Sequence, residues 1–242
     1  MSVKQDMIAN DACARKKPDM VRLTTGIPGL DEMIEGGFPF PSVILLAGSA
    51  GTGKTTFAMR YLCEGAKQGE QGLYFTTLSE PTQWMLRYAT QFDFMDPAYF
   101  NDQIVYCDLG DKLREMNENE LLNMMEEKIA EVMPQRIVID PITVIGNFMK
   151  GDYRQFLFDL TNRLKNWNAT TLMTGEVKPG EIYPPEVAYA ADGIVLLILS
   201  EEMGARRKYL EVLKMRGTNH QTGKQSIDIS RQDGIVVLKA RF

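Results

Sequence analysis

The sequence predicts an α/β fold: a mostly parallel, doubly wound sheet flanked by helices and continued at its C-terminal end by antiparallel hairpins. From residue 43 onward, short apolar runs alternate with segments of helical period, a pattern typical of such a sheet. A length of 242 residues and an apolar content of 44% suit one globular domain. Because no repeat or linker divides the chain, we assign residues 1–20 to a flexible N-terminal arm and residues 21–242 to a single domain.

Each expected strand is a short run of apolar and β-branched residues, and each expected helix places apolar residues three or four positions apart. The strands are expected at 43–47, 73–78, 104–107, 137–139, 171–174 and 194–199, and the helices at 55–67, 82–92, 118–133 and 152–167. In the third helix, for example, Leu121, Met125 and Ile129 share one face, and Pro134 ends the helix. The C-terminal hairpins are expected from paired runs around turn-like residues, 194–200 with 207–214 and 226–230 with 235–238.

Charge and composition exclude several classes of protein. The formal charge is −5 and the pI is near 5.1, so no overall basic field attracts nucleic acid or anionic lipid. The longest apolar run in the second half, residues 194–199, has six residues, whereas a membrane helix needs about 20. The first 20 residues lack the apolar segment of a secretory signal, and the three cysteines have no CxxC spacing. We therefore expect a cytoplasmic protein that does not insert into membranes.

Residues 48–55 read GSAGTGKT and match the pattern GxxxxGK[ST] directly between an expected strand and an expected helix. Glycines let successive backbone N–H groups turn toward phosphate oxygens, and the N-terminus of the following helix adds positive potential. Lys54 is then expected to reach the β- and γ-phosphates, and the Thr55 hydroxyl to coordinate Mg²⁺. The predicted nucleotide-binding residues are Gly48, Ser49, Ala50, Gly51, Thr52, Gly53, Lys54, Thr55 and Thr56.

A phosphate loop of this kind also needs a carboxylate that holds the water shell of Mg²⁺. Asp140 suits this role because it ends the apolar run 137–139, and ligands of open α/β sheets bind at the carboxyl ends of strands. The alternative is an ordinary strand-ending aspartate that caps the turn into Pro141. We favour the metal role because of the phosphate loop upstream, so that Thr55 and Asp140 form the predicted metal site.

Three segments together resemble the KaiC-like ATPases of the RecA/RadA superfamily. They are residues 22–37 (RLTTGIPGLDEMIEGG), the phosphate loop, and residues 214–220 (KMRGTNH). The resemblance runs from Arg22 to the C-terminus and corresponds to a single copy of the clock-protein domain. It implies a RecA-like P-loop NTPase fold, ATP and Mg²⁺ as cofactors, and assembly into a homo-oligomeric ring, a hexamer. The sequence contains no NKxD-type motif that would indicate a GTPase.

The resemblance also implies a catalytic base. In this family a glutamate pair after the second strand helps to activate the attacking water, and here the pair reads Ser79-Glu80, which leaves Glu80 as the candidate. Glu80 is explained equally well as a helix N-terminal residue that favours the helix dipole. The serine at 79, and Pro141 where the family has serine, leave open whether the chain hydrolyses ATP or phosphorylates itself. Residues 172–176 resemble the family strand whose polar end senses the nucleotide state.

Near the C-terminus, the resemblance places Lys214 and Arg216 at the rim of the ring, where they act on the γ-phosphate of the adjacent subunit. Two residues apart on an expected strand, they project from one face. A cation delivered in this way accelerates phosphoryl transfer by about 10³ to 10⁵. His220, the only histidine, is expected to contact the nucleotide at the same interface. The alternative for Lys214 and Arg216 is a solvated hairpin face.

Three functions follow from these observations. The leading hypothesis is a Mg²⁺-dependent, ATP-binding ring that hydrolyses ATP slowly and thereby switches its assembly or the binding of an unidentified protein partner. The second is a non-hydrolysing ATP-binding scaffold. The third is a RadA-like recombinase that binds DNA through loops 146–154 and 177–185, which supply only Lys150, Arg154 and Lys178 as cations. This thin supply disfavours nucleic acid.

Overall fold

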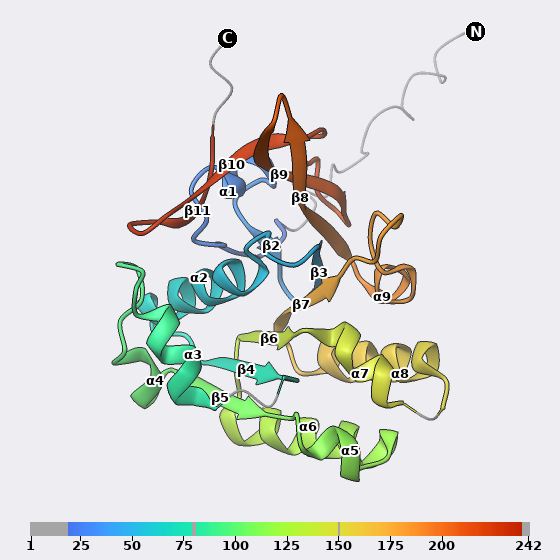
Figure 1. Cartoon of the computed structure of the whole chain (residues 1–242). Helices are drawn as coiled ribbons and strands as arrows, with labels where there is room; N and C mark the ends of the chain where they lie inside the picture. The colour runs from blue at the N-terminus through green and yellow to red at the C-terminus, as the bar shows by residue number, and fades with distance from the viewer. Residues whose placement is uncertain (1–18, 79–80, 150, 239–242) are drawn as a thin grey trace, which may run out of the picture.

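A computed structural model describes residues 19–78, 81–149 and 151–238 (Figure 1). Its main sheet has nine strands in the order β11-β10-β9-β8-β3-β7-β6-β4-β5. The strands from β8 to β5 in this order are parallel, and the C-terminal strands beyond β8 are antiparallel. The predicted fold class is confirmed. The predicted N-terminal arm falls largely on residues 1–18, which lie outside the described residues.

The parallel strands are β3 (Val43–Gly48), β4 (Gly72–Thr76), β5 (Ile104–Asp108), β6 (Arg136–Asp140), β7 (Thr170–Glu176) and β8 (Gly193–Glu202). Every residue of β3, β4 and β6 is buried, since helices cover both faces of the sheet, and this is why these strands read as continuous apolar runs. Parallel strands also align their ends. We call the side where β3, β4, β6 and β7 end the carboxyl end of the sheet, and the opposite side the amino end.

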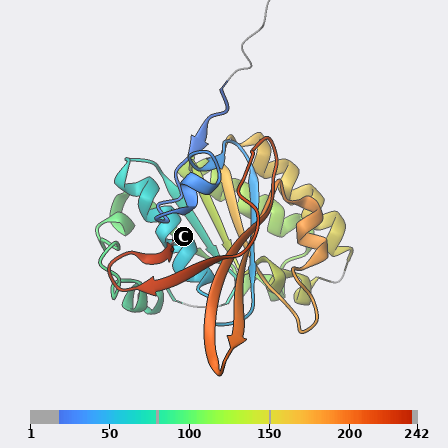
Figure 2. The same ribbon diagram turned by 90° about the horizontal axis from the view of Figure 1, so that it is seen from above.

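Helices form a layer on each face of the sheet (Figure 2). One face packs against α2 (Lys54–Lys67) and α3 (Thr82–Ala89), and the other against α6 (Glu118–Val132), α8 (Tyr153–Asn166) and α9 (Pro185–Ala190). The other helices of the described segments are short: α1 (Leu30–Met33), α4 (Tyr99–Asp102), α5 (Lys112–Glu115) and α7 (Ile142–Phe148). None of the described helices is long and apolar enough to cross a membrane.

The C-terminal strands extend the sheet beyond β8. Met203 and Gly204 adopt left-handed conformations and turn the chain into β9 (Ala205–Met215). Next, β10 (Gln225–Ser230) pairs with β9 and with β11 (Gly234–Val237). The predicted antiparallel hairpins are thereby confirmed, and the β8–β9 hairpin projects beyond the helices (Figure 2).

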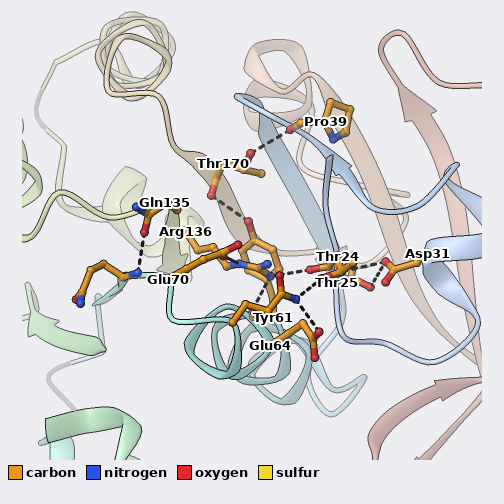
Figure 3. A network of polar contacts seen from close by, with 12 residues as sticks. Thr24, Thr25, Asp31, Pro39, Tyr61, Glu64, Glu70, Gln135, Arg136 and Thr170 are labelled. Atoms are coloured by element: carbon orange, nitrogen blue, oxygen red, sulfur yellow. Dashed lines mark hydrogen bonds and ion pairs between the residues drawn. The ribbon is translucent and has the colours of Figure 1, made fainter. Parts of the chain in front are cut away.

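A buried arginine ties the N-terminal segment to the amino end of the sheet (Figure 3). In this segment β1 (Arg22–Leu23) pairs with β2 (Phe38–Pro39). Arg136, the first residue of β6, is 0% exposed; its Nε donates to Oε2 of Glu70 at 2.5 Å. Its Nη1 donates to the carbonyl oxygens of Thr24 and Tyr61 at 2.6 and 2.9 Å. One guanidinium group therefore joins β6, α2 and the N-terminal segment.

The structure differs from the sequence prediction mainly at element ends and in short elements. The strand expected at 73–78 ends at Thr76, because its partner strand β6 ends at Asp140, the residue paired with Thr76. The helix expected at 82–92 ends at Ala89. The short elements β1, β2, α1, α4, α5, α7 and α9 were not predicted, since a few residues carry too little periodicity to be recognised.

Candidate functional site

The phosphate loop connects β3 to α2 at the carboxyl end of the sheet. Gly51 and Gly53 adopt φ values of +79° and +105°, conformations that other L-residues rarely adopt. At Gly53 space is limiting as well, since a Cβ atom there would lie 2.8 Å from Cδ1 of Ile229 on β10. The glycine at this position of the motif is therefore required both by the backbone conformation and by close packing.

Lys54 begins α2, and its side chain is folded into the loop. Its Nζ atom donates hydrogen bonds to the carbonyl oxygens of Gly48 and Ser49, at 2.9 and 3.0 Å. Burial lowers the pKa of this ammonium group below its ordinary value, and the charges of Glu176 and Asp140 oppose the shift. A cation is thus held among neutral oxygens, where anionic phosphate oxygens can compete for it. Next along α2, Thr55 is exposed and Thr56 half-buried; in the loop, Ala50 is exposed.

Asp140, at the end of β6, is 5% exposed and accepts hydrogen bonds from three hydroxyl groups. The hydroxyls of Thr55 and Tyr74 donate to Oδ2, at 2.9 and 2.5 Å. The hydroxyl of Thr174 donates to Oδ1. These donors come from α2, β4 and β7, so the structure brings together the two residues predicted for the metal site and adds two partners.

Tyr74 was not identified by the sequence analysis, and Thr174 only as part of the strand 172–176. The register explains their convergence: Thr76 is the β4 partner of Asp140, and Tyr74, two residues earlier, lies on the same face as Thr76. The only signal in the sequence for Tyr74 and Thr174 is that each places a hydroxyl group inside an apolar run. Strand order, which decides what that residue meets, cannot be obtained from the run itself.

These oxygen donors are compatible with a Mg²⁺–nucleotide complex. In such sites Mg²⁺ takes one or two protein oxygens, and water and phosphate oxygens complete its shell. Thr55 Oγ1 and Asp140 Oδ2 lie 2.9 Å apart beside the phosphate loop, so both oxygens can face one cation. Among the described residues, no group of three or more His, Cys, Asp or Glu side chains could hold a metal ion by itself. A cation at this position would therefore depend on the nucleotide for further ligands.

Lys214 and Arg216 lie at the other end of the sheet. Lys214, in β9, donates through Nζ to the carbonyl oxygen of Ala191 at 2.6 Å, and Arg216, just beyond β9, donates through Nη1 to Oδ1 of Asp192 at 2.9 Å. Lys165 of α8 donates to the same carboxylate oxygen at 3.0 Å. Burial lowers the pKa of Lys214, and the charge of Arg216 adds to this shift. We call Lys165, Asp192, Lys214 and Arg216 the amino-end cluster; Lys165 and Asp192 carried no sequence signal.

The amino-end cluster is remote from the chain's own phosphate loop. The backbone N–H of Asp192 donates to the carbonyl oxygen of Val43, the first residue of β3, and Oδ2 of Asp192 accepts from the N–H of Val43. Gly48, where the loop begins, is five residues further along β3, which corresponds to about 17 Å at 3.3 Å per residue. An arginine side chain cannot span this distance. Arg216, whose side chain is 64% exposed, is open to another molecule instead.

Comparison with known proteins agrees with this architecture. The sequence model of the family described as "ATPase: KaiC" matches residues 23–241. The chain belongs to the KaiC ATPase family. The family resemblance of the three sequence segments is thereby confirmed.

Relatives within the family are either similar in length to this chain or longer. UPF0273 protein PH0284 of Pyrococcus horikoshii is 30% identical over 233 residues, which cover 89% of this chain and 93% of that protein. Circadian clock protein KaiC3 of Synechocystis sp. is 32% identical over 90% of this chain, but the match covers 45% of that protein. The crystal structure of KaiC-like protein PH0186 from Pyrococcus horikoshii superimposes with a TM-score of 0.81 at 32% identity, covering 91% of this chain and 100% of that one.

Two further predicted site residues of this KaiC-family chain, His220 and Glu80, lie apart from the groups described above or outside the described residues. His220 is half-buried, and its Nδ1 lies 3.3 Å from the carbonyl oxygen of Gln221. The segment around it is anchored to the N-terminal region, because the N–H of Gln221 donates to the carbonyl oxygen of Met33. Ser79 and Glu80 lie outside the described residues, so the role of Glu80 as a base stays a prediction.

The loops considered for DNA binding line a groove of about 670 Å³ at the carboxyl end of the sheet. Four carboxylates and two cations line it: Asp152, Glu176, Glu181 and Glu186 against Arg154 and Lys178. Lys150 lies outside the described residues. Because this lining is acidic on balance, it disfavours contacts with a phosphate backbone.

Proposed function

We propose that this KaiC-family chain binds ATP with Mg²⁺, assembles into a homo-oligomeric ring, a hexamer, and hydrolyses ATP slowly in the cytoplasm to switch its assembly or the binding of a protein partner. The observation that carries the proposal is the convergence of Lys54, Thr55 and Asp140 on one glycine loop. The loop precedes α2, a helix of 14 residues whose N-terminus favours negative charge.

In the proposed reaction, water attacks the γ-phosphate in line with the leaving oxygen. The loop N–H groups and Lys54 bind the phosphates, and Thr55 and Asp140 hold the cation. Bound Mg²⁺ supplies positive charge that neutralises the phosphate oxygens. Glu80 orients the attacking water and accepts its proton.

The separation of the two ends of the sheet supports catalysis between subunits. Lys214 and Arg216 cannot reach the phosphate loop of their own chain, yet both cations lie beside a single carboxylate and Arg216 is largely exposed. In a ring of head-to-tail contacts, this end of one subunit can face the carboxyl end of the next. His220 contributes to the same interface in this proposal.

Turnover of γ-labelled ATP tests the reaction, with Lys54→Ala as the blank. We expect free phosphate above the blank, and Glu80→Gln should then lower it. Label retained on the protein would instead indicate self-phosphorylation. ATP binding without either product would support the non-hydrolysing scaffold, which the absence of a hydroxyl at Pro141 favours.

Mixing two inactive variants tests catalysis between subunits. Lys54→Ala removes the phosphate-binding cation and Arg216→Ala the cation offered to the neighbour. In a random one-to-one mixture, about a quarter of the head-to-tail interfaces pair an intact loop with an intact arginine. The mixture should therefore recover part of the activity that each variant lacks.

The control mixture combines Lys54→Ala with the double variant Lys54→Ala/Arg216→Ala, which never supplies an intact loop. It should remain inactive. If the first mixture also remains inactive while size measurements show mixed rings, Arg216 does not act on a neighbour. A protein that stays monomeric with ATP and Mg²⁺ would contradict the ring itself.

A further inference from the structure

Tyr74 is a buried tyrosine on β4, which lies between β6 and the edge strand β5. Its ring stacks on that of Tyr106, the opposing residue on β5, with 5.2 Å between ring centres and 17° between ring planes. Its hydroxyl donates to Oδ2 of Asp140 at 2.5 Å. A parallel strand whose residues are buried on both faces is ordinarily filled by aliphatic side chains, so the phenol group needs an explanation.

Packing alone does not explain the hydroxyl. A phenylalanine would retain the ring stack and would need no polar partner in the core, whereas a buried phenol must find one. The partner here is a carboxylate, and a hydrogen bond to an ionised acceptor is stronger than one between neutral groups. The oxygen that Tyr74 contacts is the one that also accepts from Thr55.

The three donors around Asp140 differ in what they can do when a cation binds. The hydroxyl of Thr55 is itself a predicted metal ligand, so its hydrogen bond to Asp140 is exchangeable. The hydroxyls of Tyr74 and Thr174 are both buried, and they contact different oxygens of the carboxylate. Together these two donors hold the carboxylate plane from β4 and β7.

We propose that Tyr74 is a positioning residue for the metal-binding carboxylate of Asp140. This inference rests on the proposed binding of ATP with Mg²⁺. By fixing the orientation of the carboxylate before the cation arrives, Tyr74 removes conformational freedom that binding would otherwise have to remove. Loss of such a partner typically weakens metal binding by about 10- to 100-fold.

Tyr74→Phe in the full chain tests the proposal, because it deletes the hydroxyl and keeps the ring. The measurement is binding of a non-hydrolysable ATP analogue, AMP-PNP, as a function of Mg²⁺ concentration. We expect the half-saturating Mg²⁺ concentration to rise by about 10-fold or more. Binding of AMP-PNP without Mg²⁺ should change less than about twofold, since the phosphate loop and Lys54 are untouched.

Tyr61→Phe is the matched control. Tyr61 is also fully buried, and its hydroxyl donates to the carbonyl oxygen of Thr170 at the amino end of the sheet, at 3.2 Å. The same chemical change is thus made away from Asp140, and the Mg²⁺ dependence should stay at the wild-type value. A second comparison places Tyr74→Phe in an Asp140→Asn background, where it should add less than about twofold.

The outcomes separate the two proposals. If wild-type protein binds AMP-PNP with a clear Mg²⁺ dependence that Tyr74→Phe leaves unchanged, the positioning role is wrong while the proposed function stands. If Tyr74→Phe weakens AMP-PNP binding equally with and without Mg²⁺, the positioning role is also wrong, since equal losses of affinity indicate a general packing defect. If the wild-type protein shows no Mg²⁺-dependent binding, the proposed function fails and the role of Tyr74 fails with it.

Discussion

The two ends of the parallel sheet hold their charged groups in different ways. At the carboxyl end, Asp140 is bound by neutral hydroxyls and Lys54 by carbonyl oxygens. At the amino end, Arg136 is paired with Glu70, and Asp192 with Lys165 and Arg216. Neutral partners leave most of a charge available to a ligand, whereas an ion pair satisfies the charge within the chain.

The amino end itself contains two kinds of ion pair. Arg136 is 0% exposed and makes bonds to three other segments, so it is part of the core. The amino-end cluster is partly exposed and places three cations around one carboxylate. Its positive excess is open to an anionic partner. One end of the sheet thus combines a structural charge network with an exposed one.

The largest effect is expected from a substitution that disrupts the buried network around Arg136. Arg136→Ala leaves the Glu70 carboxylate and the carbonyl oxygens of Thr24 and Tyr61 without their donor, which should cost about 3–5 kcal/mol of unfolding free energy. For a chain of this size, the melting temperature should fall by about 6–20 °C. Thermal unfolding followed by circular dichroism measures it. AMP-PNP affinity at low temperature should persist, and a parallel loss of affinity and stability would show that the two ends are not separable.

The converse change removes the cation at the carboxyl end. Lys54→Ala should lower ATP turnover by about 10²- to 10³-fold, the loss typical of one preorganised donor aimed at developing charge. The cost of burying the ammonium group offsets its two hydrogen bonds to loop carbonyl oxygens, so the unfolding free energy should change by less than about 1 kcal/mol. Steady-state turnover and chemical denaturation measure the two quantities. A large destabilisation would mean that Lys54 supports the fold.

A smaller effect distinguishes the exposed cluster from the buried network. Asp192→Asn removes the negative charge that Lys165 and Arg216 share. The unfolding free energy should fall by about 1 kcal/mol, a small loss because both cations are partly exposed. The loss should shrink in 1 M salt, where the screening length is about 3 Å. The loss from Glu70→Gln, which uncouples the buried Arg136, should be nearly the same at low and high salt. Denaturation at both salt concentrations tests the contrast, and equal salt dependence of the two variants would contradict it.

The smallest effect concerns pH. Burial raises the pKa of Asp31 above its ordinary value of 3.8, although hydrogen bonds from Thr25 oppose the shift. Because the pKa is higher in the folded state, the stability contributed by the protonated group is complete below the unfolded pKa and is lost as the pH rises through the folded pKa. Asp31→Asn does not titrate. The unfolding free energy of the variant relative to wild type should therefore increase from pH 3 to pH 6. A difference between the two proteins that does not change with pH would contradict the raised pKa of Asp31.

Features of this protein that depend on near neighbours in the chain could be predicted before the fold was known. The phosphate loop could be identified because β3, the glycines and α2 are contiguous, and apolar runs marked every parallel strand. The ends of β4 and α3 were misjudged, since β4 ends where its partner strand β6 ends and a turn ends α3. The partners of Asp140 could be identified only from the fold, because Thr55, Tyr74 and Thr174 lie far apart in the chain and strand order brings them together. It also decided that Arg216 lies at the opposite end of the sheet from the phosphate loop, since the antiparallel return of β9 carries it there.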